Sequence, residues 1–199
     1  MVDTLLFDIG NVIVHFDFGP ARARLAQASS VAGDPLEIVA ALKDRLEIGE
    51  IDGPTFVDAA IERLGYRHGR DAFRRTWESI FSPNQPMWET IAGARERYRL
   101  VLISNTSDIH KESLFRDYPI FESFDGGVYS YASRHMKPAP EAYRIAVDEL
   151  GLRPAQTLYV DDGAANVEAG RREGFVSVLY DPRQHDRFLA EARVLGVDL

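Results

Sequence analysis

The chain has 199 residues, a length that suits one domain of ordinary size or one domain with a modest insertion. Apolar residues make up 45% of it, which allows a sizeable core and argues against disorder. A formal net charge of -8, without long basic runs, disfavours a nucleic-acid partner or an anionic membrane surface.

The chain contains no cysteine, so it can form neither a disulfide nor a thiolate metal site. This composition fits a reducing compartment, and we expect a cytoplasmic location. The N-terminus lacks a charged segment followed by a long apolar stretch, so we expect no signal peptide. No apolar run approaches the length that spans a bilayer, so we expect no membrane segment.

The first element is predicted to be a buried strand over residues 2–8, which ends in a carboxylate at Asp8. Gly10 and Asn11 follow, and this pair allows a sharp turn with positive φ. Ligands bind at the carboxyl edge of open α/β sheets, so an acid delivered there is predicted to be a working group.

The stretch from Pro20 to about Phe81 has helical periodicity and no convincing strand. Residues 82–86, Ser-Pro-Asn-Gln-Pro, are expected to be a linker. We therefore predict an α/β core formed by residues 1–17 and 84–199, with a small all-helical cap at 18–83 inserted after the first strand. Its apolar stripes run through Ile38, Leu42 and Leu46, through Phe56, Val57, Ala60, Ile61 and Leu64, and through Phe73, Trp77, Ile80 and Phe81.

The remainder alternates between helices and strands, which predicts a doubly wound, Rossmann-like parallel sheet. Short buried strands are expected at 100–103, 128–129, 157–160 and 176–179. Helices are expected at 86–97 and 108–116, around Tyr143 up to Gly151, after Asp161-Asp162 up to Gly174, and at 184–195.

Polar groups follow three of the buried strands: Asp8, then Ser104-Asn105, then Asp161-Asp162. Because the ends of parallel strands share one edge, these groups can converge. Lys137 lies in a proline-flanked loop between two of the strands. Carboxylates, a hydroxyl, backbone N–H groups and one ammonium together suit a divalent cation and a phosphate.

The order Asp8-x-Gly10-Asn11, Ser104-Asn105, Lys137-Pro138, Asp161-Asp162 resembles the haloacid dehalogenase superfamily of hydrolases across nearly the whole chain. The helical insertion resembles the small cap of that superfamily. The sequence around the motifs is similar to that of bacterial α-D-glucose-1-phosphate phosphatases.

The resemblance implies a nucleophile and a metal site. Asp8 would attack phosphorus to give an aspartyl-phosphate and would also bind Mg²⁺. The backbone carbonyl of Gly10 would be a second metal ligand. Asp162, together with Asp161, would complete the set.

The resemblance also implies the phosphate contacts. The hydroxyl of Ser104 and the backbone N–H of Asn105 would hold phosphate oxygens. Lys137 would neutralise both Asp8 and the phosphate. The expected partner is thus a small-molecule phosphate ester, and the protein would be a monomer or a homodimer.

One position departs from the common pattern, in which a second aspartate two residues after the nucleophile acts as general acid and base. Here that residue is Gly10. General acid–base catalysis typically contributes about 10²–10⁴-fold. We therefore hypothesise a substrate with a good leaving group, such as a sugar 1-phosphate. His15 could replace the missing acid, although a plain loop histidine is the simpler interpretation.

Other functions stay open beside a Mg²⁺-dependent phosphatase. A haloacid dehalogenase needs no metal, and the Asp161-Asp162 pair would repel an anionic haloacid. A signalling receiver carries its acidic pair early in the chain and has no helical insertion. A catalytically weak phosphate-binding protein is suggested by Gly10. Asn166 is interpreted as structural, with a chance of contacting the acidic pair, and Trp77 and Trp88 as core residues.

Overall fold

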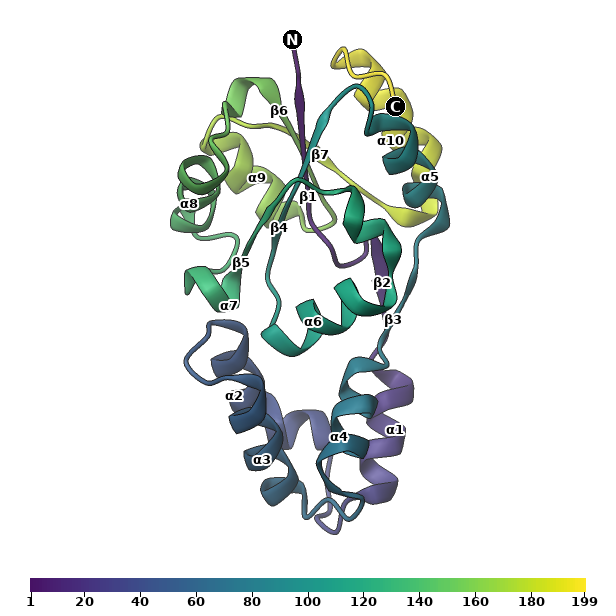
Figure 1. Cartoon of the computed structure of the whole chain (residues 1–199), viewed down its shortest axis with the longest axis vertical. Coiled ribbons are helices and arrows are strands. Elements are labelled where there is room, and N and C mark those ends of the chain that lie inside the picture. The colour runs from purple at the N-terminus through teal and green to yellow at the C-terminus, as the bar shows by residue number, and fades with distance from the viewer.

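The computed structural model describes residues 1–199. An α/β part that contains both termini lies at one end of the long axis, and a bundle of four helices lies at the other (Figure 1). Two apolar clusters lie on the two faces of the sheet, and a third lies inside the bundle. No helix combines the length and the apolar character that crossing a membrane requires.

The sheet has five parallel strands in the order β5-β4-β1-β6-β7, which confirms the predicted doubly wound fold. Phe7 pairs with Leu102 on one side and with Val160 on the other, so the carboxyl ends of the three central strands align. The first strand is shorter than predicted, because the chain turns away from the sheet after Phe7. The strands are β1 (Thr4–Phe7), β4 (Arg99–Ser104), β5 (Gly127–Tyr129), β6 (Thr157–Asp161) and β7 (Val176–Leu179).

Helices cover both faces of the sheet, because successive strand side chains point to opposite sides. On one face, Leu5 and Phe7 pack in the cluster formed with α5 (Gln85–Ala94), α6 (Asp108–Asp117) and α10 (His185–Val194). On the other face, Leu6 and Tyr159 pack with α8 (Pro140–Leu150) and α9 (Ala164–Arg172). Short turns complete the core: α7 (Ser130–Ser133) and the 3₁₀ segments Pro119–Ser123, Pro154–Gln156 and Pro182–Gln184.

The four-helix bundle is built from α1 (Gly19–Ala28), α2 (Pro35–Glu47), α3 (Gly53–Leu64) and α4 (Gly69–Glu78). Asp34 and Asp52 cap the second and third helices by accepting hydrogen bonds from backbone N–H groups two and three residues on. Trp77 is fully buried in the bundle, as expected. In the first turns of α2 it is Val39, rather than the predicted Ile38, that is fully buried.

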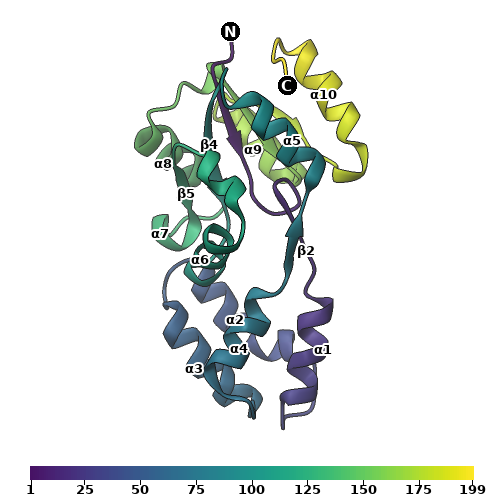
Figure 2. The ribbon, with the colours of Figure 1, turned by 45° about the vertical axis from the view of Figure 1, so that its right-hand side comes forward.

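A two-stranded antiparallel ribbon joins the two parts. It pairs β2 (Val14–Phe16) with β3 (Phe81–Pro83), and Figure 2 shows β2 running between the sheet and the bundle. The prediction of a linker at 82–86 is therefore wrong, because this segment begins in β3 and ends in α5. A three-residue strand is too short to show an alternation of apolar and polar residues, and a proline such as Pro83 is typical of loops. We propose the predicted bounds, 18–83 for the cap and 1–17 with 84–199 for the core, with the ribbon as their connection.

Candidate active site

The polar groups at the strand ends converge as predicted. Carboxylate oxygens of Asp8, Asp161 and Asp162 lie within 4.8 Å of one another. Asp8 follows β1 directly, and its backbone N–H still donates to Val160 O at 2.9 Å. Ser104 ends the neighbouring strand β4 and is buried. Alignment of these strand ends thus brings together groups that are more than 150 positions apart in the sequence.

Lys137 lies between two of the carboxylates. Its Nζ is 2.8 Å from Asp8 Oδ1 and 2.6 Å from Asp161 Oδ2, and it also donates to Ile103 O at 3.1 Å. Asn105 holds the lysine loop in place: its side chain donates to Lys137 O and accepts from Lys137 N, both at 2.8 Å. With these three acceptors around it, the ammonium is fixed rather than free to move.

Asp161 is saturated with hydrogen bonds. Its Oδ2 accepts from Lys137 Nζ and from the hydroxyl of Tyr159. Its Oδ1 accepts from Gly163 N at 2.7 Å and from Asn166 Nδ2 at 2.9 Å. A carboxylate offers about four lone-pair sites, so little of this one is left for another partner.

Asp162 is less enclosed than its neighbour. One oxygen, Oδ2, accepts from Asn11 Nδ2 at 2.9 Å, and no other side chain donates to this carboxylate. Asn11 has a positive φ of 53°, whereas Gly10 does not, so the predicted turn is made by the asparagine alone. Asn11 therefore combines the backbone turn with a contact to the acidic pair.

The charges at the site perturb one another. Burial raises the pKa of Asp8 to about 6, although Lys137 opposes this shift. Burial also raises the pKa of Asp162, against the hydrogen bond from Asn11. Burial would likewise raise the pKa of Asp161, but Lys137 and the hydrogen bonds from Tyr159 and Asn166 together outweigh it and lower this pKa. Burial disfavours the ammonium of Lys137, yet the two carboxylates outweigh it and raise its pKa to about 12.

The donor set fits a hard divalent cation. Three carboxylates share one ammonium, which leaves excess negative charge in a largely buried place. Oxygen ligands of this kind are the ones that Mg²⁺ takes. Asp8 and Asp162 have free carboxylate oxygens for such an ion, whereas those of Asp161 are engaged.

A cavity of about 160 Å³ lies between these strand ends and the helical bundle. Ser104, Asn105 and Gly10 line its floor, and the N–H groups of Gly10 and Asn105 donate to no group within the chain. Lys43 and Glu47 line it from α2. Its apolar wall consists of Ile9, Phe16, Phe18, Ile80, Phe81 and Leu114.

The ring of Phe16 lies close to Gly10, where the common pattern has an aspartate side chain. Its ring atoms lie 3.2 and 3.3 Å from where a Cβ on Gly10 would stand. His15, the other candidate for the missing acid, lies on β2 opposite Ser82 and does not line the cavity. It is therefore a strand residue, not the loop residue that we expected.

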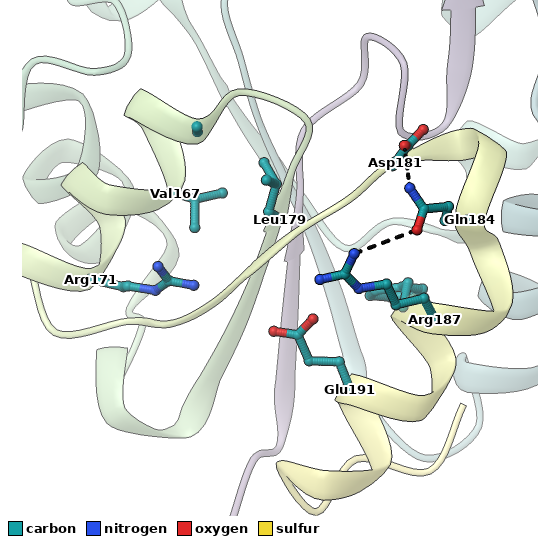
Figure 3. A pocket seen from close by; sticks show the side chains of 9 residues that line it. Val167, Arg171, Leu179, Asp181, Gln184, Arg187 and Glu191 are labelled. Atoms are coloured by element: carbon teal, nitrogen blue, oxygen red, sulfur yellow. Dashed lines mark hydrogen bonds between the residues drawn. The ribbon is translucent and has the colours of Figure 1, made fainter.

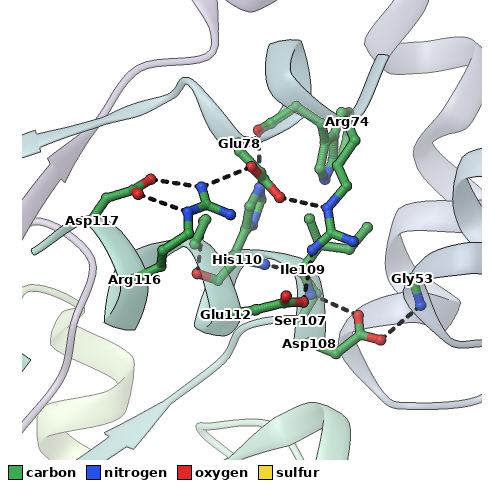
Figure 4. Close-up of polar contacts among 12 residues, drawn as sticks. Gly53, Arg74, Glu78, Ser107, Asp108, Ile109, His110, Glu112, Arg116 and Asp117 are labelled. Carbon is green, nitrogen blue, oxygen red and sulfur yellow. Dashed lines mark hydrogen bonds and ion pairs between the residues drawn. The ribbon is translucent and has the colours of Figure 1, made fainter. Parts of the chain in front are cut away.

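Polar contacts hold the bundle against α6 of the core (Figure 4). Gly53 N donates to Asp108 Oδ2 at 2.7 Å at one end of α6. Glu78, at the end of α4, accepts from Arg74 at 2.7 Å and from Arg116 at 3.1 Å. The bundle is thereby fixed over the carboxyl edge of the sheet.

A separate cavity of about 340 Å³ lies between α9, β7 and α10 (Figure 3). Arg171 and Arg187 line it from the two helices, with Glu191 nearby. No residue of the loops that follow β1 or β4 lines this cavity. The candidate site is therefore the cavity beneath the bundle together with the carboxylates and Lys137, which lie next to Gly10 and Ser104 but do not line the cavity themselves.

The order of motifs and the inserted bundle agree with a family assignment. Residues 2–174 match the family of haloacid dehalogenase-like hydrolases. The chain belongs to this family. The match covers β1, the inserted bundle, the sheet up to β6 and helix α9.

Two relatives of this haloacid dehalogenase-like hydrolase are similar to it in length. D-ribitol-5-phosphate phosphatase of Bacteroides thetaiotaomicron is 26% identical over 185 residues, which is 88% of this chain and 90% of that protein. A predicted HAD-like family hydrolase of Porphyromonas gingivalis superposes with a TM-score of 0.81 at 25% identity, covering 98% of each chain.

A second similar structure is that of an enzyme with bound ligands. A HAD family enzyme of Bacteroides thetaiotaomicron, solved with magnesium and inorganic phosphate, superposes with a TM-score of 0.82 at 20% identity. The overlap covers 92% of this chain and 95% of that one, and it shows the shared fold.

Sequence reasoning missed the residues that support the predicted ones. Tyr159 reads as an apolar strand residue, but its hydroxyl bonds Asp161. Asn11 reads as a turn residue, but it bonds Asp162. Asn166 does contact the acidic pair. Its spacing, one helical turn beyond Asp162, was the one usable signal among these.

Proposed function

We propose that this protein is a Mg²⁺-dependent phosphatase that hydrolyses a small phosphorylated metabolite through an aspartyl-phosphate. The observation that carries the proposal is the position of Lys137 Nζ, 2.8 Å from Asp8 and 2.6 Å from Asp161, beside a cavity floored by Ser104 and Asn105. A carboxylate, a fixed ammonium and unpaired backbone N–H groups together suit a phosphoryl group.

The chain supplies the nucleophile and the anion contacts. A carboxylate oxygen of Asp8 attacks phosphorus, and the leaving-group oxygen departs with its electron pair. Water then attacks the aspartyl-phosphate, which releases phosphate and restores the carboxylate. Lys137 offsets the charge on Asp8 and the phosphoryl group throughout, while the hydroxyl of Ser104 and the N–H of Asn105 bind phosphoryl oxygens.

The metal would be held by Asp8, Asp162 and the backbone carbonyl of Gly10. Bound there, Mg²⁺ supplies positive charge that neutralises phosphoryl oxygens. Asp161 belongs to the predicted set, and we assign it mainly to positioning Lys137, because both of its oxygens accept two hydrogen bonds.

The leaving group is the finer part of the proposal. Gly10 provides no acid, and the ring of Phe16 occupies the space nearby. A leaving group that departs without a proton is therefore favoured, and a sugar 1-phosphate leaves as a relatively acidic hemiacetal. The related D-ribitol-5-phosphate phosphatase and the magnesium–phosphate complex of a similar structure support the broader class of small phosphate esters.

Release of phosphate from p-nitrophenyl phosphate and from a panel of phosphorylated metabolites tests this function. We expect activity that requires Mg²⁺, stops on chelation and is lost in Asp8→Asn. The control is Asp58→Asn, the same substitution at an exposed aspartate of the bundle, and this variant should keep full activity.

Two outcomes would replace the proposal. Metal-independent release of chloride from a 2-chloro acid would make the protein a dehalogenase. Binding of phosphate without turnover of any ester would make it a phosphate-binding protein.

A further inference from the structure

The cavity is lined by a charged pair on α2 as well as by the proposed phosphate-binding residues at the end of β4. Lys43 Nζ lies 2.9 Å from Glu47 Oε2, one turn apart on α2, and both residues line the cavity. Their side chains are 33% and 16% exposed, so they are partly withdrawn from water. Of the residues that line the cavity, only these two carry a formal charge at neutral pH, because burial lowers the pKa of His110 to about 4.

The end of α2 is fixed to the core next to the residues that end and follow β4, Ser104 to Thr106. The hydroxyl of Ser130 donates to Glu47 O at 2.6 Å and accepts from Thr106 N at 2.9 Å. The turn that follows packs so closely that a Cβ on Gly49 would collide with Tyr131 O. The charged pair is therefore held at a set place relative to Ser104 and Asn105.

The pair has unused hydrogen-bonding capacity. An ammonium has three N–H donors and a carboxylate about four lone-pair sites, and the contact between them uses one of each. The pair is neutral as a whole. It can therefore donate to one hydroxyl and accept from the next, whereas a second anionic group would meet the carboxylate of Glu47.

The rest of the cavity limits what can reach the pair. Phe16, Phe18 and Phe81 present apolar faces on which C–H groups of a carbon chain can pack. The cavity is small, with a volume of about 160 Å³. A short polyol or one sugar ring suits this space better than a nucleotide does.

We propose that Lys43 and Glu47 form a subsite for adjacent hydroxyls of an uncharged leaving group, so that the enzyme prefers polyol or monosaccharide monophosphates and rejects bisphosphates. This inference rests on the proposed phosphatase function and names the substrate class of the same cavity.

The test compares a hydroxylated substrate with one that has no hydroxyl. Ribitol 5-phosphate and glucose 1-phosphate represent the first class and p-nitrophenyl phosphate the second. In Lys43→Met and Glu47→Gln we expect KM for the better hydroxylated substrate to rise about 10–100-fold, the loss typical of a hydrogen bond to a charged group. The kcat for it, and both constants for p-nitrophenyl phosphate, should stay within about threefold.

A gain of function sharpens the test. Glu47→Gln leaves the ammonium of Lys43 without its counter-charge. Hydrolysis of fructose 1,6-bisphosphate relative to glucose 1-phosphate should therefore rise in this variant and not in Lys43→Met.

The matched control is a neighbouring ion pair that joins Arg45 on α2 to Glu50 in the turn after it. Arg45 and Glu50 form an ion pair with side chains 50% and 51% exposed, and neither residue lines the cavity. Arg45→Met and Glu50→Gln should leave every constant unchanged, and thermal melting of all variants checks that they are folded.

The possible failures are distinguishable. Equal losses on p-nitrophenyl phosphate, unchanged KM for both hydroxylated substrates, or wild-type turnover of p-nitrophenyl phosphate alone would each overturn the subsite and leave the phosphatase function standing. No turnover of any ester by the wild-type protein would overturn both.

Discussion

The ring of Phe16 lies 3.2 Å from the place where a side chain on Gly10 would begin. This aromatic residue belongs to the ribbon that joins core and bundle, and it is 45% exposed. The missing acid and the ring that covers its place are thus one structural feature. A carboxylate at this position requires the ring to move aside.

The first prediction concerns this pair. Gly10→Asp combined with Phe16→Ala should speed hydrolysis of sugar 6-phosphates by about 10²-fold, because general acid catalysis helps most when the leaving group is poor. Gly10→Asp alone should give a smaller gain, since the ring restricts the new side chain. Steady-state rates on sugar 1- and 6-phosphates measure this, with Phe16→Ala as the control. Equal wild-type rates on the two classes would contradict the leaving-group hypothesis.

The second prediction concerns Asn11, which orients Asp162. Asn11→Gly keeps the left-handed backbone and removes only the amide that bonds the carboxylate. Losing a residue that orients a metal ligand typically costs about 10–100-fold in metal affinity. Titration of the melting temperature with Mg²⁺ measures it without turnover, since a bound ligand stabilises the fold. Arg134→Gly is the control, because Arg134 also has positive φ but is exposed. If the Mg²⁺ concentration that gives half of the rise in melting temperature is the same in Asn11→Gly and the wild type, the amide has no such role.

The third prediction is a pH dependence of stability caused by His110. This ring is buried against Trp77, it bonds Trp77 O at 3.1 Å, and burial lowers its pKa from 6.5 to about 4. Between these values the unfolded chain binds a proton that the folded chain does not, so stability rises with pH. The contribution is complete above pH 6.5 and is lost as the pH falls toward 4.

The measurement is urea unfolding of wild type and His110→Gln across this range. Asp8 titrates in the same window with the opposite sign, but it does so in both proteins, so the difference isolates the histidine. The wild type should lose roughly 3 kcal/mol more than the variant between pH 7 and pH 4. Parallel pH profiles would show that His110 does not titrate in this way.

The fourth prediction concerns Glu78, which holds the bundle to α6. Its side chain is 9% exposed and accepts from two arginines, one in the bundle and one in the core (Figure 4). Glu78→Gln should lower the free energy of unfolding by about 1–3 kcal/mol, because the guanidinium groups lose a buried charged acceptor. Glu112→Gln removes a 66% exposed partner of Arg74 and should cost under about 1 kcal/mol. If both changes lower the free energy of unfolding by the same amount, the ion pairs of Glu78 are no stronger than exposed surface pairs.

Much of the core and the site follows from local sequence. Each buried run of β1, β4 and β6 ends in a polar group, and parallel strands bring such ends to one edge. The prolines around Lys137 indicate the loop that carries it. The ribbon escaped prediction because each of its strands has three residues, and their partners lie more than 60 positions apart.

The parallel α/β sheet, the inserted helices and the residues that end the strands were predictable from local patterns, because apolar runs and helical periodicity can be recognised along the chain. Three features became visible only in the folded chain: Lys137 and Tyr159 bond Asp161, Phe16 covers Gly10, and Lys43 and Glu47 line the cavity. The direction of a side chain depends on how distant elements pack against one another, and no pattern along the chain encodes that packing locally.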